Sequence, residues 1–582
     1  MKYSWRLTEQ ADARTVDELS QQLKVKPIIA RLLAQRGLDS AEKAKMFFHS
    51  SLEDQHDPFL MNGMTRAVDR AFEALERYEK ILVYGDYDVD GTTGAALLYM
   101  FFRKLGANVE FYIPDRLKEG YGISTTGVEF AASAGFTLLV SVDCGVAAAK
   151  EIAYASSKGI DTIVCDHHEV EDCPDAVAVL DPIKPGCNYP FKFLSGCGVA
   201  YKFAKAISVK LGKSELPDEY LDLVAIAAAA DVVPLVGENR IFVQAGFKAI
   251  AGHPRAGIKA LLESSRVELG RLTTGQVSFN IAPRINAVGR LGDAKRAVEL
   301  LITDNADLAQ EFAQVLESEN SHRKLLDEKT FNEAQELAVQ MFARGDRSSL
   351  VLHKDSWHPG VVGIVASRIV ESFYRPTIML ATVDGVIRGS ARSVAGYDVF
   401  AAIRECSDLL LQFGGHKVAA GMALMPENLE RFSAKFEEVV ARTITEDLKT
   451  PVISIDSDLD LGEVNGDFMN TLKMFEPFGP HNSKPVFRTA NVYLSDARIV
   501  GNSHLKMKLR SNGVTFDAIK FRNGDSSVKA GARLDVVYSV DENHYAGNVY
   551  YQLQLKDFRN TSESESPRVP TGRGIGKESL GG

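Results

Sequence analysis

The chain has 582 residues, of which 45% are hydrophobic and 25% charged, and its formal net charge is −10. This composition is typical of a globular protein with several buried cores, and it excludes disorder over most of the length.

Features of other protein classes are missing from the sequence. The longest apolar run, residues 223–230, is much shorter than the roughly 20 residues that span a bilayer. The first residues lack the apolar stretch of a secretory signal, and no two of the six cysteines form a CxxC pair. We therefore predict a reduced, cytoplasmic protein with no membrane association, disulfide framework or zinc knuckle.

Charge is distributed unevenly along the chain. Residues 81–235 contain 12 Lys and Arg against 21 Asp and Glu, whereas residues 491–560 contain 10 against 7. The first region is acidic enough to need cations, and the second is mildly basic, as a nucleic-acid-binding region would be.

In chain order, residues 1–60 are predicted to form an N-terminal helical segment before the first α/β domain. From residue 81, short apolar runs alternate with helical stretches, and helices near 196–211 and 218–230 follow. This alternation predicts a parallel sheet covered by helices. The predicted strands cover residues 81–85, 109–114, 138–142, 161–165 and 177–182.

The rest of the chain predicts further domains. Residues 301–345 are predicted to form an extended helix that connects two domains. Residues 346–448 are predicted to form a second α/β domain. Residues 449–560 are rich in Val, Ile and Tyr with regular turn signals, which predicts a small antiparallel barrel. The polar Ser, Gly and Pro residues of 561–582 predict an unstructured tail.

Three predicted strands end in side chains that bind metals. The first runs into Asp86, Asp88 and Asp90, the next into Asp143, and the third into Asp166, His167 and His168. Ligands of open parallel sheets lie at the carboxyl ends of the strands. Asp231, after an apolar helical run, is a further candidate.

Carboxylates crowded together repel each other, and a shared cation relieves that repulsion. Oxygen and imidazole ligands without thiolate favour Mg²⁺ or Mn²⁺ over zinc. The number of acids indicates two ions, which together can clamp a phosphate during displacement.

Other interpretations account for less of this pattern. DYDVDG opens like a calcium EF-hand loop, but the twelfth position is Leu97 instead of glutamate. A single strand-end aspartate is more often a helix cap, and a single histidine is more often structural. Three clusters at successive strand ends favour a metal site.

Seven segments in order resemble a known family. GDYDVDGTTG, SVDCG, CDHH and AADVVPL are similar to the motifs of the DHH phosphoesterase superfamily, and RGSAR and GGHKVAAG to its DHHA1 companion domain. The long N-terminal half, the INAVGR segment and the barrel resemble the bacterial single-strand-specific exonucleases of that superfamily. The resemblance covers about residues 20–560.

The resemblance implies a DHH catalytic domain at 61–300, a DHHA1 domain at 346–448 and an OB-fold at 449–560. It implies catalytic roles for Asp88, Asp143, His167 and His168, with His168 on the scissile phosphate. The implied metal ligands are Asp86, Asp88, Asp90, Asp143, His167 and Asp231. Which of Asp86, Asp88 and Asp90 bind directly is left open.

Groups suited to an anionic substrate surround these acids. Arginine grips phosphate in a bidentate manner, and glycine lets backbone N–H groups approach it closely. Taken singly, an arginine is more often in a surface ion pair and a glycine pair in a turn. The candidates are Arg116, Arg284, Asn286, Arg290, Arg388, Ser390, Arg392, Gly414, Gly415 and His416.

The predicted barrel mixes aromatic and basic side chains, which suit a single strand by stacking on bases and following phosphates. Aromatic residues are also normal strand core, and we expect half or more of these to be buried. They are Tyr493, Phe516, Phe521, Tyr538, Tyr545, Tyr550 and Tyr551, among Lys506, Lys508, Arg510, Lys520 and Arg522.

The resemblance implies a 5′→3′ exonuclease that degrades single-stranded DNA to 5′-mononucleotides in recombination and repair, using two Mn²⁺ or Mg²⁺ ions. A single-strand-binding protein and a helicase that supplies single strands are the implied partners. A phosphodiesterase for cyclic dinucleotides or short oligonucleotides is one alternative, and an inactive single-strand-binding scaffold is another.

Overall fold

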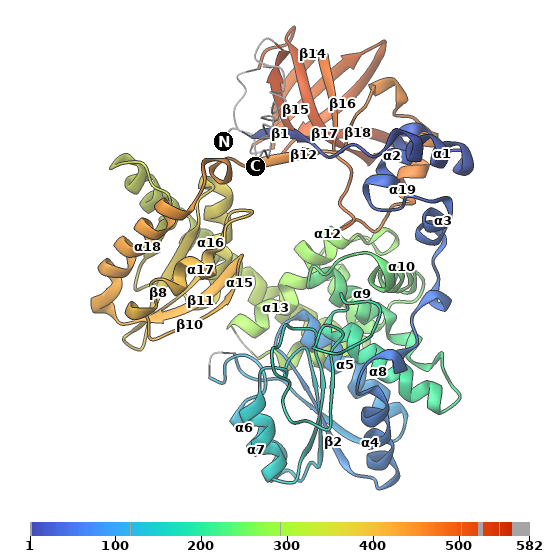
Figure 1. Cartoon of the computed structure of the whole chain (residues 1–582), viewed down its shortest axis with the longest axis vertical. Helices are drawn as coiled ribbons and strands as arrows, with labels where there is room; N and C mark the ends of the chain where they lie inside the picture. Colours follow the sequence, from blue (N-terminus) through green and yellow to red (C-terminus); the bar gives the residue numbers. More distant parts are fainter. Residues whose placement is uncertain are drawn as a thin grey trace, which may run out of the picture. The chain divides into compact units, whose positions relative to one another are not determined.

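The computed structural model describes residues 3–116, 118–291, 293–501, 503–521, 528–545 and 548–561. The described residues fall into two compact units (Figure 1). Residues 42–451 and 475–483 form the first unit, and residues 3–41, 452–474 and 484–561 belong to the second. The predicted unstructured tail, apart from Thr561, lies outside the described residues.

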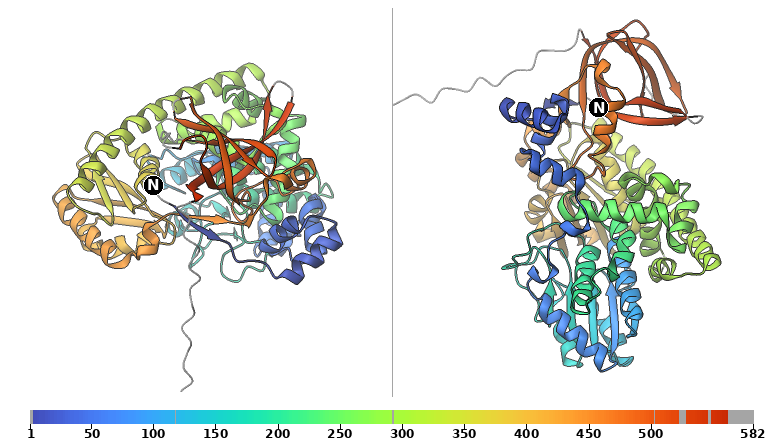
Figure 2. Two further views of the ribbon diagram at one scale, coloured as in Figure 1. Left: turned by 90° about the horizontal axis from the view of Figure 1, so that it is seen from above. Right: turned by 90° about the vertical axis from the view of Figure 1, so that its right-hand side faces the viewer.

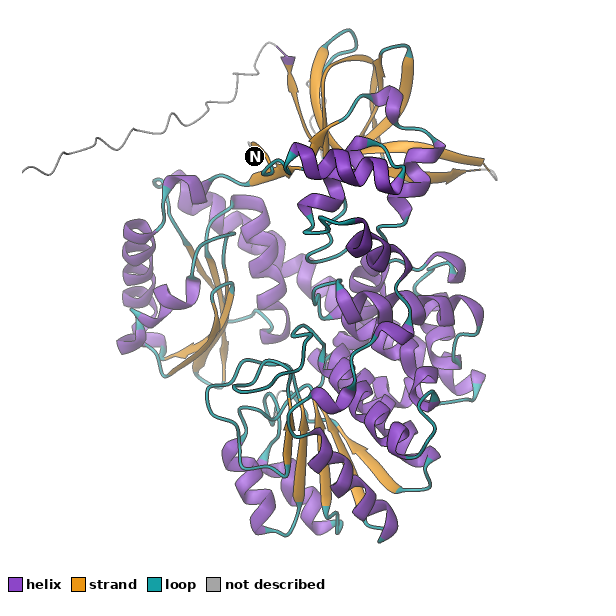
Figure 3. Ribbon diagram, turned by 45° about the vertical axis from the view of Figure 1, so that its right-hand side comes forward, coloured by secondary structure: helices purple, strands orange, loops and turns teal. Residues whose placement is uncertain are grey.

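The first unit begins with a sheet of five parallel strands in the order β3-β2-β4-β5-β6 (Figure 3). The chain runs from β2 to β3 on one side and then to β4, β5 and β6 on the other. The order therefore reverses between β2 and β4, where ligands of open α/β sheets bind. The strands are β2 Lys80–Gly85, β3 Asn108–Tyr112, β4 Leu138–Val142, β5 Asp161–Cys165 and β6 Ala178–Leu180.

Helices cover both faces of this sheet because alternate strand residues point to opposite sides. Ile81 and Val83 enter one core, and Leu82 and Tyr84 enter the other. The helices of this domain are α3 Ala41–His49, α4 Met64–Glu76, α5 Val89–Lys104, α6 Thr125–Ser133, α7 Ala149–Ser157, α8 Gly196–Lys210, α9 Leu221–Ala230, α10 Gly237–Gly252, α11 Ala256–Ser264, α12 Thr274–Gln276, α13 Ala282–Leu291 and α14 Lys295–Ile302.

The predicted connecting helix is confirmed as α15, Ala306–Ala343. The second α/β domain follows, with strand order β10-β11-β9-β8-β7, in which only β7 and β8 are parallel. Its elements are β7 Leu350–His353, α16 Pro359–Phe373, β8 Thr377–Val383, β9 Val386–Arg392, α17 Val399–Arg404, β10 Gln412–His416, β11 Ala419–Leu424 and α18 Leu429–Thr443. In the part of the chain described, no helix combines the length and apolar character needed to cross a bilayer.

The second unit contains the predicted barrel. Strands β14 to β18 close through pairing of β14 with β17, and β16 runs parallel to β18, which is the OB-fold topology. Its elements are β12 Val452–Ile455, β13 Ser457–Asp458, α19 Gly466–Lys473, β14 Phe487–Val500, β15 His504–Ser511, β16 Val514–Lys520, β17 Arg533–Tyr545 and β18 Asn548–Asn560.

The N-terminal residues belong to this barrel unit, which the sequence did not indicate. Strand β1 (Ser4–Leu7) pairs in parallel with β12, and the helices α1 (Ala13–Leu23) and α2 (Pro27–Gln35) follow it. The dark-blue helices lie beside the red barrel in both views of Figure 2. The Trp5 indole N–H donates to Asp557 over 2.9 Å.

Aliphatic side chains such as Leu505, Met507 and Leu509 fill the barrel interior. Of the six barrel aromatics whose side chains are described, Tyr538 alone is fully buried. The expectation that half or more are buried is therefore wrong: Tyr493, Phe521 and Tyr550 are exposed, and Phe516 and Tyr551 are only half-buried. Arg522 and the side chain of Tyr545 lie outside the described residues.

Candidate active site

The three strand-end aspartates are brought together by strand register. Gly85 of β2 is opposite Val142 of β4, which is opposite Cys165 of β5. The next residues, Asp86, Asp143 and Asp166, therefore emerge at one level of the sheet edge. The Asp86 N–H donates to the Val142 carbonyl over 3.3 Å, and the Asp143 N–H donates to the Cys165 carbonyl over 2.9 Å.

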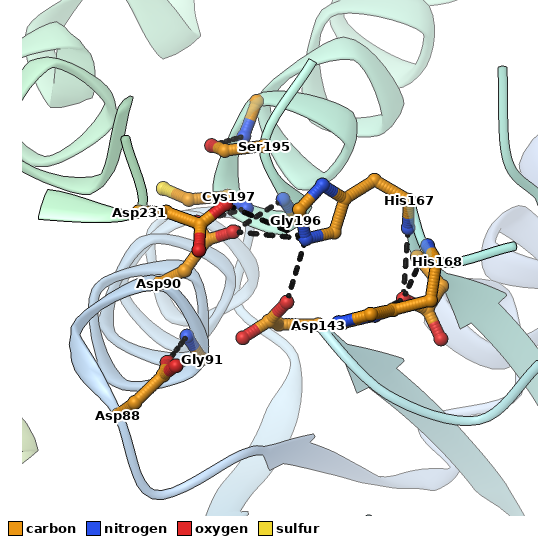
Figure 4. Close-up of polar contacts among 12 residues, drawn as sticks. Asp88, Asp90, Gly91, Asp143, His167, His168, Ser195, Gly196, Cys197 and Asp231 are labelled. Atoms are coloured by element: carbon orange, nitrogen blue, oxygen red, sulfur yellow. Dashed lines mark hydrogen bonds and ion pairs between the residues drawn. The ribbon is translucent and has the colours of Figure 1, made fainter. Parts of the chain in front are cut away.

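The first turn of α5 supplies two more carboxylates. Asp88 is the N-cap of α5 and accepts the Gly91 N–H over 3.1 Å. Asp90 is buried and accepts the N–H groups of Gly196 and Cys197 over 2.6 and 2.8 Å. These donors begin α8, whose helix dipole favours a negative charge there. Figure 4 shows Asp90 directed at this helix end.

Two glycines allow this close packing. A Cβ atom on Gly91 would lie 2.4 Å from the Asp86 backbone nitrogen, and one on Gly196 would lie 2.6 Å from the Asp143 Cβ. The acids can lie this near to α5 and α8 only because both positions lack a side chain.

His167 lies among three carboxylates (Figure 4). Its Nε2 atom is 3.1 Å from Asp143 Oδ1 and 3.7 Å from both Asp90 Oδ2 and Asp231 Oδ2. Among the described residues, three sets could each hold a metal ion, and Asp143 and His167 occur in two of them. The sets are Asp86, Asp88 and Asp143; Asp90, His167 and Asp231; and Asp143, His167 and His168. All six predicted metal-binding residues therefore lie in adjoining sets.

The electrostatics of these acids suit a cation. Burial, together with the charge of Asp88, raises the pKa of Asp86 to about 8. Burial and the charges of Asp90 and Asp88 raise the pKa of Asp231 to about 8, and burial and neighbouring carboxylates also raise the pKa of Asp143. Within the described residues, the buried Oδ1 atom of Asp86 has no hydrogen-bond partner. Hard divalent cations such as Mg²⁺ or Mn²⁺ fit this oxygen-rich donor set.

Asp166 has a different role from the other strand-end acids. Its Oδ1 atom accepts the Nδ1 proton of His168 over 2.7 Å and the N–H of His167 over 2.8 Å. Burial opposes both charges, but this contact lowers the pKa of Asp166 and raises the pKa of His168 to about 9. The sequence placed Asp166 among the metal-type side chains; the structure shows it orienting His168.

Tyr121 was not singled out from the sequence, although it lies in the same loop as Arg116. Its hydroxyl donates to the Asp143 carbonyl over 3.0 Å and lies 3.4 Å from His168 Nε2. The ring is 55% exposed, so it can meet a ligand bound above the acids. A glycine-flanked tyrosine in an otherwise charged loop is the only local signal of this position.

Arginines of the first α/β domain gather near the acids, with one exception. The Arg116 guanidinium lies 4.9 Å from the centre of the Tyr87 ring. Burial, and then the charges of Arg116, Arg323 and Arg392, lower the pKa of Arg290 to about 10. Arg323, on α15, was not singled out from the sequence.

Arg284 is the exception, because it is buried and its Nε atom pairs with Glu317 of α15 over 2.5 Å. Asn286, on the same helix, has a buried Oδ1 atom with no hydrogen-bond partner in the described part of the chain.

The second α/β domain presents its candidates on one sheet face. Arg388, Ser390 and Arg392 alternate along β9 and so share a side. The register aligns Ser390 with Gly421 and Gly414, and Arg392 with Ala419 and His416. The Arg392 guanidinium donates to the Ser390 hydroxyl over 2.6 Å.

The small residues of β10 leave room above that face. A Cβ atom on Gly414 would have no neighbour within 4 Å, whereas Gly415 has φ +142° and a Cβ there would meet Ala419 and Ala420 at 2.5 Å. The positive φ and the close neighbours at position 415 require a glycine there. At position 414 the absence of a side chain leaves the surface between His416 and Ser390 open.

One cavity joins the two α/β domains of the first unit. It has a volume of about 400 Å³ and is lined by Tyr121, Asp166 and His168 from the first domain and His416 from the second. His168 of the first domain and His416 of the second therefore border a shared space.

Comparisons with known proteins match the same three domains. Residues 80–228 match the DHH family N-terminal domain, residues 339–442 the DHHA1 domain, and residues 455–557 the RecJ OB domain. The single-stranded-DNA-specific exonuclease RecJ of Bacillus subtilis is 39% identical over 563 residues, covering 96% of this chain and 71% of that protein. The chain belongs to the RecJ family.

Solved RecJ structures agree with this assignment. RecJ of Thermus thermophilus in complex with Mn²⁺ has a TM-score of 0.82 and 30% identity, covering 96% of this chain and 79% of that one. The Mg²⁺ complex of the same RecJ has a TM-score of 0.77 and 30% identity, covering 96% of this chain and 78% of that one. The predicted family resemblance and α/β fold with a C-terminal OB-like barrel are confirmed.

Proposed function

We propose that this chain is a metal-dependent exonuclease that degrades single-stranded DNA from its 5′ end and releases 5′-mononucleotides. The observation that carries this proposal is the pair of adjoining ligand sets, one with Asp86, Asp88 and Asp143 and one with Asp90, His167 and Asp231, at the switch point of the sheet, in a chain of the RecJ family. Each domain would have the role that the sequence resemblance implies. The DHH domain (61–300) and the DHHA1 domain (346–448) would cleave the DNA strand, and the OB-fold (449–560) would bind it.

The described side chains define how the centre would act. Asp86, Asp88, Asp90, Asp143, His167 and Asp231 would hold two Mn²⁺ or Mg²⁺ ions. When bound, these ions lower the pKa of the attacking water and stabilise charge on the phosphoryl oxygens. His168, kept protonated by Asp166, donates a charged hydrogen bond to a phosphoryl oxygen while the 3′-oxygen leaves.

Groups of the DHHA1 domain would set the polarity. Arg392, Ser390 and His416, with the open backbone at Gly414 and Gly415, would hold the terminal 5′-phosphate. Arg116, Asn286, Arg290 and Arg388 would contact further phosphates, and Arg284 would support them through Glu317. A passage between the two domains too narrow for two strands would exclude duplex DNA.

The cellular setting is part of the proposal. A 5′→3′ single-strand exonuclease acts where single strands are exposed, as in recombination and repair in the cytoplasm. A single-strand-binding protein that coats the substrate and a helicase that produces it are the proposed partners.

Timed digestion of a long single strand labelled at either end, with Mn²⁺ or Mg²⁺, tests the proposal. We expect 5′-label to appear first as mononucleotide, and Asp143→Ala to abolish its release. Release of the 3′-label first would overturn the polarity, and cleavage of a dinucleotide but not of the long strand would reject the substrate.

A further inference from the structure

A hollow of about 730 Å³ lies on the barrel of the second unit. Its walls are the residues after β13, an irregular stretch of β14, the turn between β15 and β16, and the first residue of β17. The irregularity is a shift of register between Thr489 and Val492, where Asn491 has φ +56°. The hollow is therefore formed by backbone that leaves the regular barrel.

The hollow lies at the opposite end of the barrel from the two loops that OB-folds use to bind a ligand. OB-folds bind strands across their second and third strands and the loops joining strands one to two and four to five. Here the first of these loops joins Val500 to His504, at one end of β15, whereas the hollow surrounds Arg510 at the other end. The loop between β17 and β18 follows Tyr545, and the hollow contains Arg533 at the opposite end of β17.

An aromatic ring stands between two arginines at its centre. Tyr493 of β14 is directly opposite Arg510 of β15 and Arg533 of β17, so the three side chains form one row on the outer face. Tyr493 is 38% exposed, and the Arg533 guanidinium lies 5.6 Å from its ring centre. Neither arginine has a carboxylate partner among the described residues.

The carboxylates at the rim of the hollow already accept hydrogen bonds from neighbouring protein groups. Arg488 holds Asp458 with two hydrogen bonds of 2.6 and 2.9 Å. Asp460 accepts the Asn512 amide over 2.5 Å and the Gly462 N–H over 2.7 Å. Arg533 also donates to the Asn491 carbonyl over 3.2 Å. The hollow thus combines two arginines that have no carboxylate partner in the described part of the chain, an exposed ring and acceptor oxygens along one edge.

We propose that this hollow binds a nucleotide unit, with its base on Tyr493 and its phosphate between Arg510 and Arg533. Aromatic stacking and arginine contacts are the usual means of holding a base and its phosphate. The N–H groups of a base can donate to the rim carboxylates, whereas a polyacidic peptide would be repelled by them. This site is separate from the catalytic acids and does not depend on the proposed exonuclease activity.

The nucleotide unit could be a free mononucleotide or part of a strand, and fluorescence distinguishes the two. Full-length protein in EDTA, which prevents cleavage, is titrated with 2-aminopurine 5′-monophosphate and, separately, with an oligonucleotide containing one internal 2-aminopurine. Stacking on tyrosine quenches this base. We expect quenching that Tyr493→Ala removes, and affinity that Arg510→Gln and Arg533→Gln each reduce about fivefold or more.

Two matched variants serve as controls. Tyr550→Ala removes another exposed aromatic, and Arg498→Gln removes an exposed arginine from the far end of β14. Both should leave the affinity of the monophosphate unchanged. Quenching by the monophosphate would identify a free nucleotide as a ligand, and quenching by the oligonucleotide alone would identify the strand.

The proposal is overturned if, for both probes, quenching and affinity are the same in wild type, Tyr493→Ala, Arg510→Gln and Arg533→Gln. Binding of a fluorescent polyacidic peptide that needs Arg510 and Arg533, with no nucleotide binding, would also overturn it. Asp143→Ala should keep the quenching, so loss of exonuclease activity and loss of this site are separate results.

Discussion

The Nδ1 atom of His168 lies 2.7 Å from the Oδ1 atom of Asp166, so the imidazole has a fixed orientation beside the metal-type acids. Asp166→Asn should lower kcat about 10–100-fold with little change in KM, as loss of residues that orient site groups commonly does. Steady-state digestion of a labelled single strand measures this, with the exposed Asp172→Asn as control. An unchanged kcat would show that the contact is only structural.

The same contact predicts a pH dependence in the metal-free protein. Because the pKa of His168 is raised from 6.5 to about 9, its imidazolium contributes full stability below about pH 6.5 and loses that contribution as pH rises through about 9. Histidine-labelled NMR spectra should show this titration near pH 9 in wild type and at lower pH in Asp166→Asn. Equal titration in both proteins would contradict the ion pair.

Shared and unshared metal ligands should behave differently. Asp143 belongs to the set with Asp86 and Asp88 and also lies 3.1 Å from His167 of the other set, whereas Asp231 belongs to that other set alone. Asp143→Ala should therefore lose both Mn²⁺ ions and Asp231→Ala only one. Calorimetric titration with Mn²⁺ measures the stoichiometry, and Asp175→Ala, at an exposed acid, is the control. Two ions bound to Asp143→Ala would reject the assignment.

Gly196 should tolerate no side chain. Its Cβ would lie 2.6 Å from the Asp143 Cβ, so Gly196→Ala should lower the free energy of unfolding by about 1–3 kcal/mol and weaken Mn²⁺ binding. Gly252→Ala, where a Cβ meets nothing within 4 Å, is the matched control for chemical denaturation. Equal stability of the two variants would mean that the α8 end can shift.

A buried ion pair supports the DHH domain. Lys202 Nζ lies 2.7 Å from Glu238 Oε1, and both side chains are almost fully buried. Glu238→Gln leaves the lysine charge unpaired and should cost about 3–5 kcal/mol of unfolding free energy. Glu219→Gln breaks the exposed 2.7 Å pair with Lys104 and should cost less than about 1 kcal/mol. Similar losses measured by urea denaturation would contradict the role of burial.

The sequence by itself determined the strand–helix alternation, the acids at three strand ends and the long helix α15. These features are local, because apolar periodicity and the residues directly after each strand are read over short stretches. Parallel topology then placed Asp86, Asp143 and His167 at one edge without knowledge of any distant contact.

Only the tertiary structure decided which groups meet across long stretches of chain. Asp90 receives N–H groups from residues 106 and 107 positions away, Arg284 is drawn to Glu317, and β1 joins β12 in the barrel unit. Tyr493 gains its two arginine neighbours from strand register alone. Such partners depend on packing between distant segments, which no local pattern of residues encodes.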